Sequence, residues 1–76
     1  MNEYGVKMIP VSSSNVQAIG YNDANQVLYV RFNSNALYSY QSVPIALFYG
    51  LQSASYVGSY LDLNIKKAGY VYQQLE

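Results

Sequence analysis

The residues that could carry acid–base or metal chemistry are few in this sequence and far apart. The 76 residues include no histidine, which is the usual general base and the commonest metal ligand. They also include no cysteine, so neither a disulfide nor a thiolate metal site can form. The four acids, Glu3, Asp23, Asp62 and Glu76, have no ligand spacing. We therefore expect a protein that is not an enzyme and that has no cofactor and no metal site.

Tyrosine is the side chain that stands out. The chain has ten tyrosines and no tryptophan, and two of the tyrosines flank a serine in Tyr38-Ser39-Tyr40. A tyrosine ring can pack in a thin core while its hydroxyl reaches the rim. Exposed aromatic rings on a sheet can instead stack on the bases of RNA. Both interpretations are open for this motif on composition alone.

The charges of the chain argue against strong electrostatic binding of nucleic acids. Four cations balance four acids, so the formal net charge is zero and no basic patch is evident. Contacts with phosphates would rest on Arg31, Lys66 and Lys67, and they would be weak unless another module helped. A solvated helix end is the plainer interpretation of the lysine pair.

Alternating apolar residues predict three antiparallel strands joined as a meander. The expected strands are 16–21, 26–32 and 36–40. The first turn is expected at 22–25 and the second at 33–35, where Asn35 takes a left-handed conformation. Gly20 lies inside the first strand, which indicates a close approach by another side chain.

The turn lengths predict which residues face each other across the strands. The second turn pairs Leu28 with Tyr40 and Val30 with Tyr38, and the first pairs Ile19 with Leu28. Because alternate side chains share a face, Tyr38 and Tyr40 join Leu28 and Val30 on one apolar face. Ile19 and Tyr21 of the first strand join the same face. The odd-numbered side chains between residues 28 and 40 then point to the opposite face, which would be open to a partner.

Two helices are expected to cover the tyrosine-bearing face. They span 45–54 and 59–67, with Ser42 as the cap and Pro44 in the first turn. Gly50 permits close contact between the first helix and the sheet. The predicted fold class is α+β: a three-stranded antiparallel meander with two C-terminal helices packed on one face. This arrangement favours core packing over base stacking for Tyr38 and Tyr40.

The ends of the chain are expected to add little to this single domain of residues 1–76. Residues 8–11 are an apolar stretch that could form only an edge strand, because Pro10 cannot donate to a ladder. Residues 71–74 predict a last extended piece, and the core spans about 8–72. We expect residues 1–7 to be flexible, and Leu75-Glu76 resembles the junction of an expression tag.

No apolar run could span a membrane, and a cytoplasmic location is expected.

A series of short motifs resembles the KTSC domain family over roughly residues 8–72. The motifs are Val11-Ser12-Ser13-Ser14-Asn15-Val16, Ile19-Gly20-Tyr21-Asn22, Leu28-x-Val30-x-Phe32, Tyr38-x-Tyr40-x-x-Val43-Pro44, Ala54-Ser55, Gly58, Tyr60 and Asn64-Ile65-Lys66. The family occurs at the C-terminus of some lysyl-tRNA synthetases and as a small free-standing bacterial protein. This chain departs from it at Asn22 and Asn35, where the family commonly has Asp and Gly, and is less basic near its last helix.

The resemblance implies a bacterial domain of undetermined function, for which RNA, either tRNA or single-stranded, has been suggested as the ligand. We therefore expect a small non-catalytic binding module. The candidate contact residues are Tyr29, Arg31, Tyr38, Tyr40, Lys66 and Lys67. The alternative is a protein-interaction or self-association domain that uses the outer sheet face with Val27, Tyr29 and Leu37.

Overall fold

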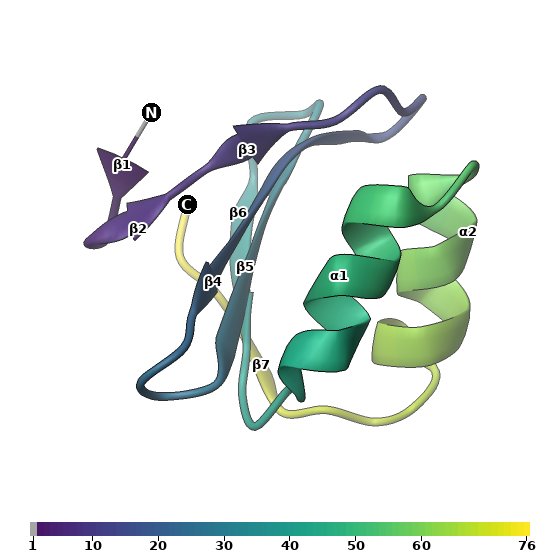
Figure 1. Cartoon of the computed structure of the whole chain (residues 1–76). Coiled ribbons are helices and arrows are strands. Elements are labelled where there is room, and N and C mark those ends of the chain that lie inside the picture. Colours follow the sequence, from purple (N-terminus) through teal and green to yellow (C-terminus); the bar gives the residue numbers. More distant parts are fainter. Residues whose placement is uncertain (1) are drawn as a thin grey trace.

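A computed structural model describes residues 2–76, which form a sheet covered on one face by a helical layer (Figure 1). The five-stranded antiparallel sheet has the order β3-β4-β5-β6-β7. Its strands are β3 (Ile9–Pro10), β4 (Val16–Asn22), β5 (Val27–Phe32), β6 (Leu37–Tyr40) and β7 (Tyr72–Gln74). A separate antiparallel hairpin is formed by β1 (Asn2–Glu3) and β2 (Val6–Lys7). The α+β class is confirmed.

The sheet has five strands, so the predicted three-stranded meander is only part of it. The expected meander is β4-β5-β6, and the structure adds β3 beside β4 and β7 beside β6. β7 places Tyr72 opposite Tyr40 and Gln74 opposite Tyr38. Both added strands are two or three residues long, which is too short for an alternating pattern to identify. β7 in addition pairs with a strand more than thirty residues earlier in the sequence, whereas β3 pairs with the next strand, β4.

The register between β5 and β6 is confirmed. Leu28 lies opposite Tyr40 and Val30 lies opposite Tyr38. Asn35 has a φ of 73°, so the turn between the two strands closes with a left-handed residue as expected. The tyrosine motif therefore shares a face with the apolar residues of β5.

The register between β4 and β5 differs from the prediction by two residues. Ile19 lies opposite Val30, and Tyr21 takes the place opposite Leu28. The connecting turn begins one residue later than expected and includes Gln26 with a φ of 56°. The face of Ile19 and Tyr21 remains correct, because a shift of two residues preserves the alternation of side chains. Val16, which strict alternation puts on the other face, is instead buried in the core, because the register shifts between Val16 and Ala18.

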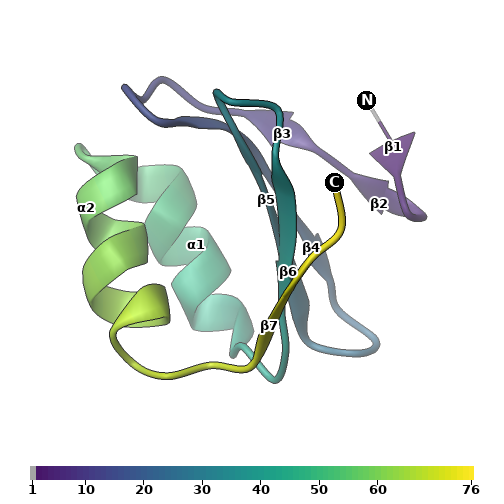
Figure 2. The same ribbon diagram turned by 180° about the vertical axis from the view of Figure 1, so that it is seen from behind.

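The helical layer covers one face of the sheet (Figure 2). It packs against Ile19 of β4 and the even-numbered side chains of β5 and β6. It consists of α1 (Ile45–Ser53) and α2 (Val57–Leu61), and α2 continues as a π-helical segment, Asp62–Lys66. The fully buried side chains that join the two layers are Val16, Ile19, Leu28, Val30, Val43, Leu51 and Ile65. The core thus lies where the sequence predicts, under the two C-terminal helices.

Three details of the helices differ from the predictions. Ser42 does not cap α1: Pro44 is the N-cap residue and Ser42 has a φ of 57°. The second helix begins at Val57 rather than at residue 59. Gly50 approaches the next helix instead of the sheet, because a Cβ at this position would overlap the hydroxyl of Tyr60.

The outer face of the sheet is covered by the N-terminal hairpin, which lies on the side away from the helices (Figures 1 and 2). Val6 and Met8 are buried, at 4 % and 2 % exposure. A Cβ on Gly20 would lie 2.7 Å from each of these side chains, which confirms the close approach expected at this glycine. The Tyr4 ring stacks on Tyr29 with 6.2 Å between centroids. We expected the outer face to be open to a partner, but the N-terminal hairpin covers it.

The two ends of the chain both contribute to the fold. Residues 2–7, expected to be flexible, form the hairpin, while Met1 lies outside the described residues. Leu75 donates its backbone N–H to the carbonyl oxygen of Leu37 at 2.7 Å, so the chain continues along β6 after β7 ends. None of the helices in residues 2–76 has the length and apolar character needed to cross a bilayer.

Candidate functional site

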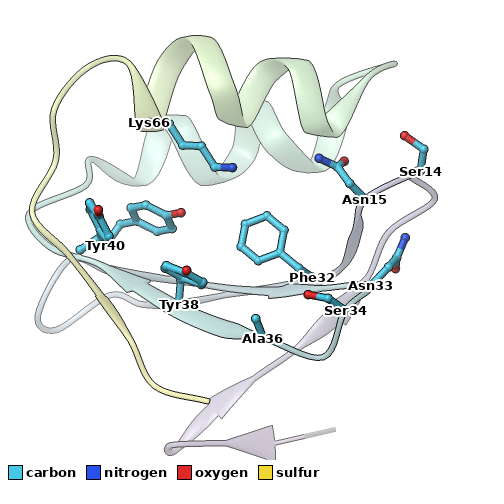
Figure 3. Close-up of a pocket in the computed structure, with 10 residues that line it drawn as sticks. Ser14, Asn15, Phe32, Asn33, Ser34, Ala36, Tyr38, Tyr40 and Lys66 are labelled. Carbon is cyan, nitrogen blue, oxygen red and sulfur yellow. The ribbon is translucent and has the colours of Figure 1, made fainter.

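A pocket of about 690 Å³ lies between the sheet and the π-helical segment (Figure 3). It is lined by Ser14, Asn15, Phe32, Asn33, Ser34, Ala36, Tyr38, Tyr40, Lys66 and Tyr72. We call it the aromatic pocket. In Figure 3 Lys66 extends from the helical layer toward the sheet, and the Phe32 and Tyr38 side chains point from the sheet toward the helical layer.

Four aromatic rings from three neighbouring strands form one side of this pocket. The Phe32 ring meets Tyr38 edge to face, with centroids 5.6 Å apart, and Tyr38 stacks on Tyr40 at 6.3 Å. Tyr72 of β7 lies 6.0 Å from Tyr38 and 6.1 Å from Tyr40. Tyr40 is only 3 % exposed, whereas Tyr72 is 65 % exposed. The cluster therefore runs from the core to an accessible aromatic surface.

The pocket carries a local positive charge although the whole chain is neutral. The Nζ of Lys66 lies 4.9 Å from the centroid of the Phe32 ring, within the range of a cation–π contact. No Asp or Glu is among the residues that line the pocket. An anionic group entering it would meet Lys66 without a competing carboxylate on the walls.

The phenol groups of Tyr38 and Tyr40 have different surroundings in the pocket. Tyr38 donates its hydroxyl to Oε1 of Gln74 at 3.2 Å. Burial, with smaller contributions from the neighbouring Tyr38 and Tyr72, raises the pKa of Tyr40 to about 12. The Tyr40 hydroxyl therefore keeps its proton near neutral pH.

The structure separates the residues that the sequence suggested as contacts. Tyr38, Tyr40 and Lys66 come together in the aromatic pocket. Lys67 is not among the lining residues and pairs with Asp62, with 3.4 Å between Nζ and Oδ2. The candidate residues on the helical layer are therefore divided, since Lys66 lines the aromatic pocket and Lys67 does not.

Tyr29 and Arg31 lie on the opposite face of the sheet. Tyr29 is half-buried beneath Tyr4. Arg31 donates from Nη1 to Oε1 of Glu76 at 2.8 Å and to the carbonyl oxygen of Asn35 at 2.7 Å. The hydrogen bond from Arg31 lowers the pKa of the Glu76 carboxyl. These two residues are engaged by other parts of the chain.

Tyr72, Phe32 and Asn15 are among the pocket residues that sequence reasoning did not propose as contacts. Phe32 could have been found, because the alternation already places it on the face of Tyr38. Tyr72 lies in the expected last extended piece, and only its pairing with Tyr40 brings it to the site. Asn15 belongs to a loop, where no periodic signal indicates which way the side chain points.

The outer face suggested for a protein partner is largely inaccessible. Val27 is 8 % exposed and Leu37 is fully buried, while Tyr29 is half-buried. The hairpin and the C-terminal residues supply contacts on this side of the sheet. A protein partner would therefore have to use another surface of the domain.

Comparison with known proteins gives a consistent assignment. A family model described as the KTSC domain matches residues 12–70. An uncharacterised protein of Stutzerimonas stutzeri (strain A1501) is 31 % identical over 71 residues, which cover 93 % of this chain and 100 % of that protein. A protein of Tsukamurella paurometabola is 39 % identical over 59 residues, covering 78 % and 88 % of the two chains.

A solved structure extends this likeness to the fold. The crystal structure of a KTSC domain protein from Yersinia pestis matches with a TM-score of 0.87 and 30 % sequence identity, covering 93 % of this chain and 99 % of that chain. The resemblance that the sequence motifs predict is thereby confirmed. The chain belongs to the KTSC domain family.

Proposed function

We propose that this chain is a small non-catalytic module that binds single-stranded RNA by taking an unpaired base into the aromatic pocket. The observation that carries this proposal is the combination of accessible aromatic rings with one cation in a single pocket. Single-stranded RNA offers flat bases for stacking and phosphates for a basic side chain. The pocket supplies a partner for each of these two groups.

Stacking would provide most of the binding free energy. A base stacked on an aromatic side chain contributes about 1–3 kcal/mol. Tyr72 is the best-placed ring, because it is 65 % exposed and lies beside Tyr38 and Tyr40. Tyr40 is only 3 % exposed, so it would pack against Tyr38 and Tyr72 rather than contact the base.

Lys66 would provide the phosphate contact, at the centre of the pocket. With a single such contact, the affinity should fall by about 0.7 log unit for a tenfold rise in salt. This weak salt dependence agrees with the zero net charge of the chain. Binding of RNA also agrees with the cytoplasmic location expected from the sequence.

The experiment is a titration of short single-stranded RNA, with tRNA in parallel, followed by NMR chemical shifts at low salt. We expect shifts at Tyr38, Lys66 and Tyr72. Tyr72→Ala should weaken binding by about 5- to 150-fold, which corresponds to the loss of one stacked base. Lys66→Gln should remove the salt dependence, whereas Lys67→Gln, which alters the neighbouring lysine outside the pocket, should leave affinity nearly unchanged.

Two results would contradict the proposal. Absence of shifts with RNA at several hundred micromolar would exclude this ligand for the domain. Shifts confined to the face of Tyr29 and Arg31 would move the contact to the opposite side of the sheet. Dimer formation in sedimentation, without RNA binding, would instead favour the self-association alternative.

A further inference from the structure

A second pocket adjoins the aromatic pocket. It has a volume of about 800 Å³ and lies between the loop before β4 and the connection from α1 to α2. Hydroxyl groups of Ser12, Ser55 and Ser59 belong to its lining residues, together with Tyr56 and Asp62. We call it the serine pocket. Its polar walls contrast with the rings of the aromatic pocket.

The two pockets share a wall made of Ser14 and Asn15, which line both. Hydrogen bonds hold this wall in place. The backbone N–H of Asn15 donates to Oγ of Ser13 at 3.3 Å, and the backbone N–H of Asn33 donates to the carbonyl oxygen of Asn15 at 2.9 Å. The two pockets are therefore neighbours on the molecule, with these two residues between them.

The Asn15 side chain rests against the start of α2. A Cβ on Gly58 would overlap Oδ1 of Asn15, so the close contact depends on the absence of a side chain at this glycine. The wall is thus positioned from both sides, by the turn after β5 through Asn33 and by the helical layer through Gly58. The position of Asn15 between the two pockets is therefore fixed by contacts within the folded chain.

Tyr56 is an available stacking surface in the serine pocket. Its side chain is 79 % exposed, the largest value among the exposed large apolar residues of the described chain. A ring so exposed contributes little to the core. It is therefore free to pack against a flat apolar group of a ligand.

We infer that the two pockets bind consecutive nucleotides of one RNA strand, so the ligand is an oligonucleotide rather than a single nucleotide. One base lies in the aromatic pocket, the backbone crosses Asn15, and a neighbouring base stacks on Tyr56. This inference rests on the proposed function and adds the path of the strand.

The charges along this path indicate its chemistry. Lys66 provides the cation on the aromatic side. On the other side, the carboxylate of Asp62 pairs with Lys67 and accepts hydrogen bonds but does not donate them. The serine pocket therefore suits the hydroxyl groups of ribose better than a phosphate, and the 2′-hydroxyl distinguishes RNA from DNA.

The experiment measures affinity against ligand length, using uridine monophosphate and uridylate oligomers of two to four nucleotides. We expect the oligomers to bind the wild type about 5- to 150-fold more tightly than the monophosphate, the range for one added stacked base. Tyr56→Ala should reduce oligomer affinity toward that of the monophosphate and leave the monophosphate unaffected. Tyr49→Ala is the matched control, because Tyr49 is 57 % exposed and lines neither pocket.

The outcomes separate this inference from the proposed function. If the monophosphate binds as tightly as the oligomers and Tyr56→Ala changes nothing, the aromatic pocket binds a base but the extended path is wrong. If neither the monophosphate nor any oligomer binds, both proposals fail. If oligomers of deoxyuridine bind as tightly as those of uridine, the role given to ribose in the serine pocket is refuted.

Discussion

Removal of the Tyr40 hydroxyl should make the protein more resistant to unfolding at high pH. The Tyr40 ring is 3 % exposed, and burial raises its pKa to about 12, from the ordinary value of 10.0. In the unfolded chain the same phenol meets water and has its ordinary pKa. Between these two values the unfolded state releases a proton that the folded state retains.

The sign and size of the effect follow from this difference. Because the unfolded state binds fewer protons above pH 10, the free energy of unfolding decreases as the pH rises toward 12. Each unit of pKa difference corresponds to about 1.4 kcal/mol, so the loss from Tyr40 reaches about 2 kcal/mol near pH 11.5. Below pH 9 this phenol is protonated in both states and adds no pH dependence to the free energy of unfolding. Tyr40→Phe should abolish the loss while keeping the ring.

The assay is urea denaturation followed by circular dichroism at a series of pH values from 8 to 11.5. The measured quantity is the difference in unfolding free energy between wild type and Tyr40→Phe, because the raised pKa values of Tyr4 and Tyr21 affect both proteins equally. Between pH 8 and pH 11.5 the free energy of unfolding of Tyr40→Phe should rise by about 2 kcal/mol relative to that of the wild type. Tyr56→Phe, which alters a ring that is 79 % exposed, is the control and should follow the wild type. A difference that does not vary with pH would refute the argument from burial.

Two further substitutions test the packing and the turn. Gly20→Ala should lower the free energy of unfolding by about 1–3 kcal/mol in urea denaturation, because the new Cβ would lie 2.7 Å from Sδ of Met8; an unchanged stability would mean that the N-terminal hairpin does not constrain this site. Asn35→Gly should raise the stability by up to about 1 kcal/mol, since the φ of 73° is less strained for glycine. A lower melting temperature for this variant would show that the Asn35 side chain stabilises the turn.

The register at the second turn could be read from local sequence. A three-residue turn with Asn at its last position leaves one pairing that keeps the apolar residues of both strands on the same face, and the structure has this pairing. The first turn was less informative, because several polar residues in a row allow it to begin at more than one position. In the structure the turn ends at Gln26. The alternation of apolar residues cannot distinguish the two registers, because they differ by two residues and keep the same side chains on each face.

The candidate site could be predicted only in part. Tyr38 and Tyr40 were correctly placed on the face under the helices, and the structure adds that the first is half-buried while the second is 3 % exposed. The position of Lys66 over Phe32 was not predictable, because it depends on the continuation of α2 as a π-helical segment. A change in helical pitch of this kind rotates the last side chains of a helix, and helical spacing alone does not reveal it.

The sequence alone determined which side chains of the meander face inward, except at Val16 beside the register shift in β4, because alternation along a strand is a local property with a period of two residues. Only the tertiary structure decided what covers each face and where the accessible aromatic surface lies. β7 reaches β6, and the hairpin reaches Gly20, through contacts between residues distant along the chain. Such contacts depend on how the whole chain closes on itself, and short segments carry no local signal for their partners. The aromatic pocket therefore exists only in the folded protein, where Tyr72 and Lys66 are brought to the same face as Tyr38.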